Sequence, residues 1–242
     1  MAPRSGIDRN DLILTPFKAI KHNMMRIDLH VHSTLSPCSK LGISQILSHA
    51  RARGLDGVCI TDHDTMAAAR RVTEGIQPDG LCLLVGAEYT TPGGDFLIFG
   101  PFDRLPPGLS TETLLTTVYA RGGVAVAAHP FRAVRPADLP VFRHSPGPLI
   151  ETRNGRNTAA ENRQAQRLGD HLGIPGTGGS DAHRLDELGR VVTHIDRPVR
   201  SRADLIAALR AGDCRADWGL NGHQTGGPVR AVVPAFTASR TA

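Results

Sequence analysis

Histidine and carboxylate side chains recur along this chain at the ends of short apolar segments. The first example is an H-x-H pair, His30 and His32, at the end of the segment 26–31. Alternate residues of an extended strand point to the same side, so both imidazoles can face one cavity and bind one metal ion. On its own the pair is a weak signal, because two ordinary loop histidines would look the same. It gains weight from the similar segments that follow.

Four later segments carry the same kinds of side chain in the same position. Residues 61–64 read TDHD, Glu88 follows LLVGA, His129 follows VAVAA, and residues 180–183 read SDAH. A helix cap or a buried salt bridge would explain any one of these segments. Five of them in succession are better explained by a shared site, in which Asp181 and His183 again lie on one face of a strand.

The candidate ligands are imidazoles and carboxylates, without a cluster of thiolates. Cys38, Cys59, Cys82 and Cys214 are widely spaced and form no C-x-x-C pair. Histidine and carboxylate ligands suit Zn, Mn or Fe, and there are more of them here than one ion can use. Several neighbouring ions lower the pKa of a bridging water and neutralise charge on a phosphoryl oxygen. This chemistry suits the hydrolysis of phosphoesters better than amide hydrolysis at a single zinc ion.

The elements that must position these side chains alternate between short apolar segments and helical patterns. This alternation is typical of parallel β/α units. An open sheet builds its site from the two or three strands at its switch point, whereas here nearly every strand ends in a polar residue. The sequence therefore predicts an α/β fold with a closed β/α barrel. Capping boxes at residues 158–161 and 201–204 predict the starts of two helices.

A length of 242 residues fits one domain of generous size. Residues 1–24 show no sustained periodicity and are expected to be an extension that is partly disordered. Residues 25–213 are expected to form the barrel. The glycine-rich residues 214–242 are expected to be a tail that packs on the barrel or is flexible.

Composition excludes several classes of protein. Hydrophobic residues make up 40% and charged residues 21% of the chain, which excludes a disordered or collagen-like protein. No segment approaches the ~20 apolar residues of a membrane span and no secretory signal is evident, so a cytoplasmic protein is expected. The net charge of +5 tolerates anionic substrates, but scattered arginines and only 4% aromatic residues argue against a stacking platform for single strands.

Six segments of the chain resemble, in order, the motifs of a known family. They read IDLHVHSTLS, ITDHD, LVGAEYT, AAHPFR, ETRNGRN and GSDAH and span residues 27–183. The ordered combination resembles the PHP (polymerase and histidinol phosphatase) phosphoesterases. The resemblance implies a distorted seven-stranded (β/α)7 barrel in a single domain, with two or three divalent metal ions (Mn, Zn or Fe) at the carboxyl ends of the strands.

The resemblance also implies how the ions divide their ligands. His30, His32, Glu88 and Asp181 look like the ligands of one ion, Glu88 and His129 like those of a second, and His63 and His183 would complete the cluster.

Two positions depart from the family's pattern. Cys38 stands in a loop where many members have an aspartate, and it is either a substitute ligand or an ordinary loop cysteine. Asp95, in DFLIFG, stands where members often have a histidine. Aspartate is a competent ligand for Mn or Fe, so Asp95 is expected to bind metal.

Arginine side chains are expected to hold the substrate, because a guanidinium binds phosphate through two hydrogen bonds. Arg132 and Arg156 belong to loops expected at the mouth of the cavity, and Arg184 follows the last motif. Each of them could instead be a solvated surface arginine. Four residues are candidates for proton transfer, and spacing does not choose among them: His63, Asp62, Asp64 and His183. Glu151 is expected either to orient a ligand histidine or to form a salt bridge inside the barrel.

The favoured function is that of a metal-dependent phosphoesterase, which hydrolyses a phosphate ester of a small metabolite or nucleotide through a metal-activated water. The alternatives are an exonuclease or cyclic-nucleotide phosphodiesterase on the same metals, or a non-catalytic barrel that binds a phosphorylated ligand. A nucleic acid is the less favoured substrate, because the chain carries no polymerase or oligonucleotide-binding module. An amidohydrolase would need a lysine ligand, and no lysine follows Lys40. No oligomeric state is predicted.

Overall fold

The computed structural model describes residues 24–220, in which eleven strands form two mixed sheets. The larger sheet has six strands in the order β11-β10-β1-β2-β4-β3. β1 runs parallel to β2 and β2 to β4, whereas β3, β10 and β11 are antiparallel to their neighbours. The strands of this sheet are β1 (Met25–Val31), β2 (Gly57–Ile60), β3 (Gly75–Ile76), β4 (Cys82–Val85), β10 (Val191–Ile195) and β11 (Cys214–Trp218).

The smaller sheet has five strands in sequence order, β5-β6-β7-β8-β9. Its first three strands pair in antiparallel fashion, and β7, β8 and β9 run parallel to one another. The strands are β5 (Ala87–Thr91), β6 (Gly94–Phe99), β7 (Val124–Ala127), β8 (Leu149–Asn154) and β9 (Gly176–Gly179).

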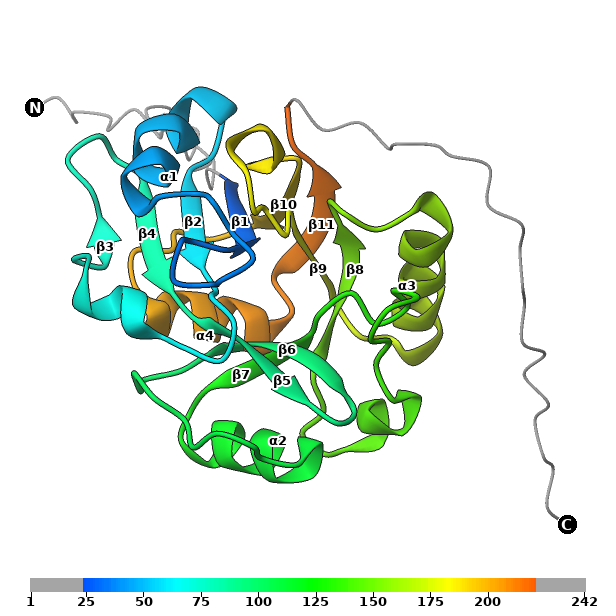
Figure 1. Ribbon diagram of the computed structural model, residues 1–242. Coiled ribbons are helices and arrows are strands. Elements are labelled where there is room, and N and C mark those ends of the chain that lie inside the picture. The colour runs from blue at the N-terminus through cyan, green and yellow to red at the C-terminus, as the bar shows by residue number, and fades with distance from the viewer. Residues whose placement is uncertain (1–23, 221–242) are drawn as a thin grey trace, which may run out of the picture.

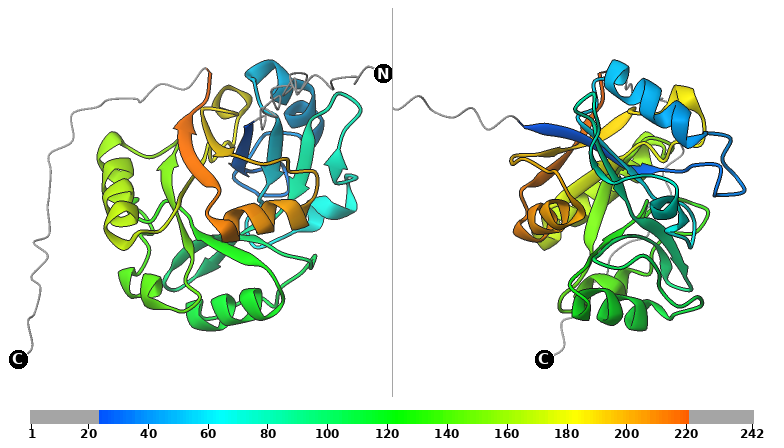
Figure 2. Two further views of the ribbon diagram at one scale, coloured as in Figure 1. Left: turned by 180° about the vertical axis from the view of Figure 1, so that it is seen from behind. Right: turned by 90° about the vertical axis from the view of Figure 1, so that its left-hand side faces the viewer.

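The helices of the described residues lie around the two sheets (Figures 1 and 2). In Figure 1, α1 lies at the top, α2 at the bottom and α3 beside β8, and the view from behind in Figure 2 shows α4 on the opposite face. The α-helices are α1 (Ile43–Ala50), α2 (Thr111–Ala120), α3 (Ala159–Leu172) and α4 (Arg202–Ala211). Short 3-10 helices span Arg51–Arg53, Ala67–Arg70, Leu139–Arg143 and Leu185–Glu187.

Both predicted helix starts lie where the caps placed them. The side chain of Thr158 accepts the backbone N–H of Glu161, and Glu161 accepts the N–H of Thr158, which completes a capping box at the start of α3. Ser201 accepts the N–H of Asp204 at the start of α4. These side chains satisfy N–H groups that have no partner inside the first turn of a helix.

The central strands are buried on both faces, which explains their continuous apolar sequences. Every residue of β2, β4, β6 and β7 is buried. On β6, Phe96 and Ile98 pack in one apolar cluster while Leu97 and Phe99 pack in the other. This alternation places β6 between two apolar layers. The polar side chains that matter for chemistry therefore come from strand ends and from the loops that follow.

The two sheets approach each other at two isolated bridges. Val31 at the end of β1 bridges Ala182, and His63 bridges Glu88 on β5. The predicted α/β class in one domain is confirmed. The closed seven-stranded barrel is not observed within residues 24–220, because a single residue pair joins the sheets at each of these bridges in place of a continuous ladder.

Part of the expected tail belongs to the larger sheet. β11 lies in the segment 214–242 and pairs along its whole length with β10. Residues 221–242 and the expected N-terminal extension, apart from Met24, lie outside the described residues. Among the helices of residues 24–220, none combines the length and the apolar character that a membrane crossing requires.

Candidate metal centre

The side chains of His30 and His32 lie together because alternate residues of β1 point to the same side of the sheet. Both are buried, and their Nε2 atoms lie 3.0 Å apart. His30 Nδ1 lies 3.0 Å from Glu151 Oε1, to which it donates. His32 Nδ1 lies 3.2 Å from Ser36 Oγ, whose own proton goes to Asp62 Oδ1, so His32 Nδ1 is the donor in this pair. Each Nε2 therefore carries a lone pair, and the two lone pairs face each other.

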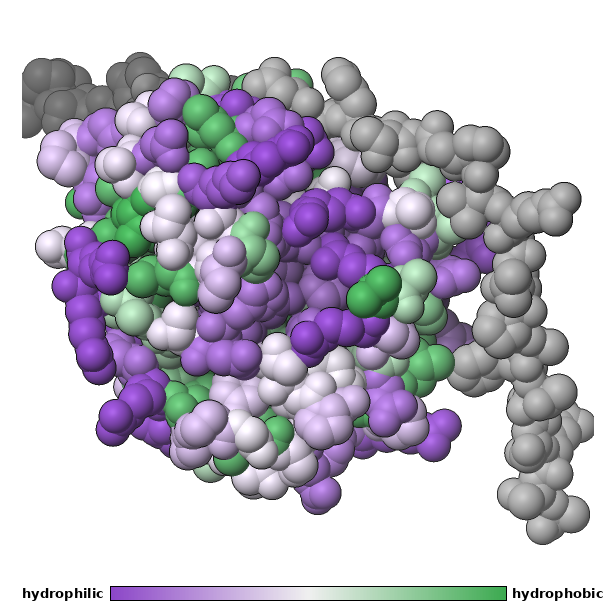
Figure 3. Space-filling view, viewed as in Figure 1, coloured by the Kyte–Doolittle hydropathy of each residue, from purple (hydrophilic) through white to green (hydrophobic). Residues whose placement is uncertain are grey.

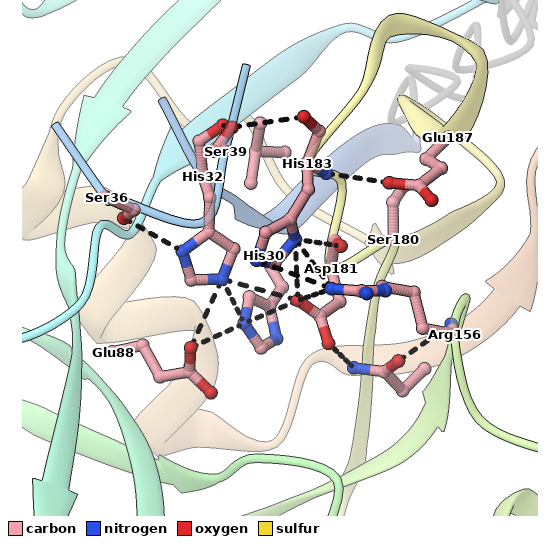
Figure 4. A network of polar contacts seen from close by, with 12 residues as sticks. His30, His32, Ser36, Ser39, Glu88, Arg156, Ser180, Asp181, His183 and Glu187 are labelled. Atoms are coloured by element: carbon pink, nitrogen blue, oxygen red, sulfur yellow. Dashed lines mark hydrogen bonds and ion pairs between the residues drawn. The ribbon is translucent and has the colours of Figure 1, made fainter. Parts of the chain in front are cut away.

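Two carboxylates complete this arrangement. Asp181 Oδ1 lies 3.6 Å from His30 Nε2 and 3.3 Å from His32 Nε2. Glu88 Oε2 lies 3.3 Å and 3.2 Å from the same two nitrogens (Figure 4). Two nitrogen lone pairs and two anionic oxygens thus converge on one buried point, where they repel one another unless a cation or a proton lies among them. This donor set fits a divalent metal ion.

Three more histidines extend the cluster. His129 Nε2 lies 2.7 Å from Glu88 Oε1, whereas His30 and His32 lie nearest to the other oxygen, Oε2. His63 Nδ1 lies 3.0 Å from Glu88 Oε2. The rings of His63 and His183 lie 4.4 Å and 4.3 Å from the ring of His32. Glu88 is therefore the residue around which the strand ends converge.

The ligand atoms form three overlapping groups, in each of which all atoms lie within 4.8 Å of one another. The groups are His30–His32–Asp181, His30–Glu88–His129 and His32–His63–His183. Glu88 Oε2 is a buried oxygen that makes no hydrogen bond of normal geometry within the described residues. Such an orphaned oxygen among imidazoles is what a metal ligand requires, and this mixture of imidazole and carboxylate suits Zn, Mn or Fe.

Opposite charges shift the pKa values within this buried cluster. Burial alone would raise the pKa values of Glu88 and Asp181, but the charge of His30 and the hydrogen bonds of the neighbouring histidines together outweigh burial, so both pKa values lie well below their usual range. Burial alone would lower the pKa of His30, yet Asp181, Glu151 and Glu88 hold it well above its usual value. A proton on His30 is therefore one cation that stabilises the cluster, and a metal ion would have to displace it.

His183 behaves differently from His30. Burial and the neighbouring charge of His32 lower the pKa of His183 to about 4. The ring is thus neutral at pH 7 and can act as a ligand without losing a proton. Arg156 Nη1 lies 2.9 Å from His183 Nδ1, so this arginine borders the cluster directly.

Two sets of hydrogen bonds hold the histidines in place from outside. Glu151 accepts a hydrogen bond from His30 Nδ1 on Oε1 and one from the backbone N–H of His129 on Oε2, the latter over 2.8 Å. Asp62 accepts hydrogen bonds from the N–H and hydroxyl of Ser33 and from the hydroxyl of Ser36. Carboxylates and hydroxyls in such positions fix the tautomer and orientation of ligand histidines.

Asp28 also supports the cluster, although sequence reasoning did not single it out. It is fully buried and lies on β1, two residues before His30. Its carboxylate accepts the N–H and the hydroxyl of Ser180 and the N–H of Gly189, which ties the segment carrying Asp181 to β1. The alternation D-x-H-x-H was the available signal, because it extends the H-x-H pattern by one more residue.

The three predicted substrate arginines occupy different surroundings. Arg132 Nη2 donates to Asp181 Oδ2 over 2.7 Å and to Asn154, so it reaches the cluster. Arg156 lies against His183 and is 42% exposed. Arg184 is 63% exposed and pairs with Asp186 and Glu187. The first two arginines therefore border the ligands, whereas Arg184 pairs with the exposed Asp186 and the buried Glu187.

The remaining predicted site residues lie outside the three ligand groups. Asp62 is buried with its oxygens occupied by serine donors, and Asp64 accepts the N–H of Thr90 over 2.8 Å. Cys38 is exposed on its loop. Asp95 is buried and pairs with Arg135 Nη2 at 2.7 Å, a contact with an arginine that the motifs did not indicate. Figure 3 shows this face of the molecule hollowed near its centre, with hydrophilic residues around the hollow.

Two family models match the chain. The model described as PHP domain matches residues 28–121, and the model described as PHP-associated matches residues 159–214. Among curated proteins, the uncharacterized protein MJ1587 of Methanocaldococcus jannaschii is 28% identical over 120 residues, which cover 46% of this chain and 70% of that protein.

Several solved structures share the fold. PsfC from Pseudomonas syringae PB-5123 matches with a TM-score of 0.64 and 22% identity, over 81% of this chain and 92% of that one. A candidate metal-dependent phosphoesterase from Bifidobacterium adolescentis matches with a TM-score of 0.56 and 20% identity, over 66% of this chain and 88% of that one. Endonuclease Q, solved with a duplex that carries an abasic lesion, matches with a TM-score of 0.61 and 15% identity, over 79% of this chain and 58% of that one.

Proposed function

We propose that this chain, which belongs to the PHP domain family, is a metal-dependent phosphoesterase that hydrolyses a phosphate ester of a small metabolite or nucleotide. The observation that carries the proposal is the convergence of the His30 and His32 lone pairs with the oxygens of Glu88 and Asp181. Buried atoms of this kind are stable together only with a cation among them. A cluster of several such groups is suited to phosphoryl chemistry.

The metal ligands are drawn from the three groups of the cluster. One ion would be held by His30, His32, Glu88 and Asp181, and a second by Glu88 and His129, with His63 and His183 completing the cluster. His30 and His32 each have one free ring nitrogen and can hold one ion, whereas Glu88 has two oxygens and can be shared between two. Divalent ions, when bound, lower the pKa of a water molecule and neutralise charge on a phosphoryl oxygen.

The arginines beside the cluster are suited to binding the phosphate group. Arg132 is held by Asp181, Asn154 and Asn157, so its guanidinium is oriented before any substrate arrives. Arg156 approaches from the His183 side and is more exposed. Guanidinium groups fixed in this way stabilise negative charge on non-bridging oxygens at little cost in reorganisation.

His63 and His183 are also proposed to assist proton transfer, each through the ring nitrogen that does not face an ion, and the His63 side chain is 34% exposed. Asp62 is proposed to act indirectly, because its oxygens are engaged by Ser33 and Ser36 and it holds the loop that orients His32. Asp64 lies next to His63, but one of its oxygens is taken by the backbone of Thr90.

A panel of substrates tests the proposal. Phosphomonoesters, cyclic phosphodiesters and short oligonucleotides would be incubated with the protein loaded with Mn²⁺, Zn²⁺ or Fe²⁺. We expect a phosphomonoester to be hydrolysed, with the activity lost on chelation and reduced roughly 10²-fold or more in His63→Ala and Asp181→Ala. The matched control is His171→Ala, an exposed histidine on α3.

Each other outcome has a defined meaning. Wild-type turnover in both His63→Ala and Asp181→Ala would contradict the site. Preferred cleavage of oligonucleotides would favour a nuclease, a function found on this fold in endonuclease Q. Metal binding without hydrolysis of any member of the panel would favour a protein that binds a phosphorylated ligand without catalysis.

A further inference from the structure

Asp95 is a buried carboxylate beside the cluster that takes no part in its ligand groups. It lies at the start of β6 and is only 3% exposed. Asp95 pairs with Thr90 of β5, two residues after Glu88, and its carbonyl oxygen accepts the N–H of Ala128, which precedes His129. Asp95 is therefore close to both ligands. Nevertheless the three groups of ligand atoms within 4.8 Å do not include it. Its role must be sought in what it does contact.

The partner of Asp95 is Arg135, whose Nη2 lies 2.7 Å from Asp95 Oδ1. A guanidinium is charged at every accessible pH, so it neutralises this carboxylate permanently. Asp181 is paired with Arg132 in the same way, but unlike Asp181 the Asp95 carboxylate belongs to none of the three ligand groups. The pair instead holds one edge of the Arg135 guanidinium, while half of that side chain remains exposed. Arg135 therefore keeps donors available for an anion.

The loop that carries Arg135 is built to bring it to this position. The N–H of Ala137 donates to Pro130 O, which closes the loop, and the N–H of Ala133 is held by Glu161. Arg135 itself has a φ of +69°, a left-handed conformation that is unfavourable for a residue with a side chain. Such strain persists only where the surrounding contacts require it, and it is common where side chains clamp ligands.

The same loop also carries Arg132. Arg132 pairs with Asp181, and Arg135 pairs with Asp95, so one loop places guanidinium groups at two carboxylates beside the cluster. Asp181 belongs to the ligand groups, and Asp95 lies beside the segments that carry Glu88 and His129. A phosphate at the cluster would thus be approached by arginines from two directions.

We propose that Asp95 is a positioning residue that holds Arg135, and that Arg135 binds the phosphate group of the substrate at the Glu88–His129 side of the cluster. This inference rests on the proposed function for the identity of the anion. It differs from the expectation that Asp95 ligates a metal ion, and the two can be separated by measurements that need no turnover.

The first measurement is the metal content. Wild type, Asp95→Asn, Arg135→Gln and Glu88→Gln would be equilibrated with MnCl₂ and their bound Mn²⁺ determined by mass spectrometry. We expect Asp95→Asn and Arg135→Gln to bind as many ions as wild type, whereas Glu88→Gln loses at least one. Loss of an ion in Asp95→Asn but not in Arg135→Gln would make Asp95 a ligand and overturn the proposal.

The second measurement is the affinity of the Mn²⁺-loaded protein for inorganic phosphate, by calorimetry. We expect Arg135→Gln to bind phosphate about tenfold more weakly. Asp95→Asn removes a negative charge, which on its own would strengthen phosphate binding. If Asp95→Asn binds phosphate more weakly than wild type, and Asp95→Asn combined with Arg135→Gln binds it no more weakly than Arg135→Gln alone, then Asp95 acts by positioning Arg135.

Control variants on α3 separate a specific loss of phosphate binding from a general effect of charge. Arg167→Gln and Asp170→Asn change exposed charges on α3 and should leave phosphate binding and metal content as in wild type. Unchanged phosphate affinity in Arg135→Gln, or stronger binding in Asp95→Asn, would overturn the inference even if the protein is a phosphoesterase. Conversely, the expected phosphate effects in a protein that hydrolyses nothing would sustain the inference and reject the proposed activity.

Discussion

The Nε2 atoms of His30 and His32 face each other at 3.0 Å, with both Nδ1 atoms committed as donors to Glu151 and Ser36. In most proteins a buried histidine pair avoids this arrangement by letting one ring donate to the other. Here the outer hydrogen bonds prevent that solution. The repulsion between the lone pairs can be relieved only by a proton or a metal ion between them, so the two compete for the same place.

The first prediction is that metal binding releases protons and strengthens with pH. The pKa of His30 lies well above its usual value because of Asp181, Glu151 and Glu88, so this ring is protonated at pH 7 before an ion binds. The ion must displace that proton, and the apparent affinity should rise up to tenfold for each pH unit per proton released. Calorimetry of Mn²⁺ binding in two buffers of different ionisation enthalpy measures the number released. A value of zero at pH 7 would contradict the assignment.

The second prediction concerns Glu88, whose two oxygens face different partners. Oε1 lies 2.7 Å from His129 Nε2, and Oε2 lies 3.0 Å from His63 Nδ1. Glu88→Gln keeps the shape but removes the charge, so we expect the protein to lose at least one metal equivalent and most of its activity. His171→Gln, which changes an exposed histidine, should lose neither. Full metal occupancy in Glu88→Gln would exclude Glu88 as a shared ligand.

The third prediction concerns Glu151, which touches no expected ion and acts through His30. Glu151→Ala should weaken metal binding by roughly 10–100-fold, because it frees the ring of His30 and the backbone of His129. Glu151→Gln should lose less, since its amide oxygen can still accept from His30. Titration of Mn²⁺ into each variant measures this order, and folding is checked separately by thermal unfolding without metal. Equal affinities for wild type and Glu151→Ala would rule out an orienting role.

The positions of the cluster residues followed from the sequence because they depend on short-range regularities. H-x-H on a strand must present both rings to one side, and the carboxylate or histidine that follows each apolar segment emerges where that strand ends. The helix caps were equally local. Thr158 caps α3 in a complete capping box, whereas Ser201 caps α4 without one, because Asp204 accepts the N–H of Arg200 instead of that of Ser201.

The parts that sequence reasoning did not provide depend on contacts distant along the chain. Closure of the barrel depends on the number of backbone pairs that join the two sheets. The structure has one pair at each junction, Val31 with Ala182 and His63 with Glu88, and no pattern in the nearby sequence predicts that number. Likewise, the sequence near Asp95 does not predict its pairing with Arg135, which lies forty residues later. The motif TDHD shows two carboxylates beside His63 but not which one turns toward the serines of another loop.

The fourth prediction is a pH dependence of folding that arises from Asp28. Burial raises the pKa of Asp28 from 3.8 to about 6. Because the folded pKa exceeds the unfolded one, this group favours the folded protein most below pH 4, and that contribution is lost as the pH rises to 6. The loss amounts to about 3 kcal/mol. Urea unfolding of metal-free wild type and Asp28→Asn across pH 3–7 should show their difference changing by about this amount in favour of the variant, and a constant difference would contradict it.

The fifth prediction concerns Cys38, which is exposed while Cys59 and Cys82 are buried. Burial and the charges of Asp181 and Glu88 raise the pKa of the Cys38 thiol, so it is less reactive than a free cysteine at pH 8. Metal ions would neutralise those carboxylates and lower this pKa. Alkylation of Cys38 by iodoacetamide, followed by mass spectrometry, should therefore accelerate when Mn²⁺ is added. Since only the thiolate reacts, an ion bound to the sulfur would slow the reaction instead, and protection of Cys38 by Mn²⁺ would identify it as a ligand.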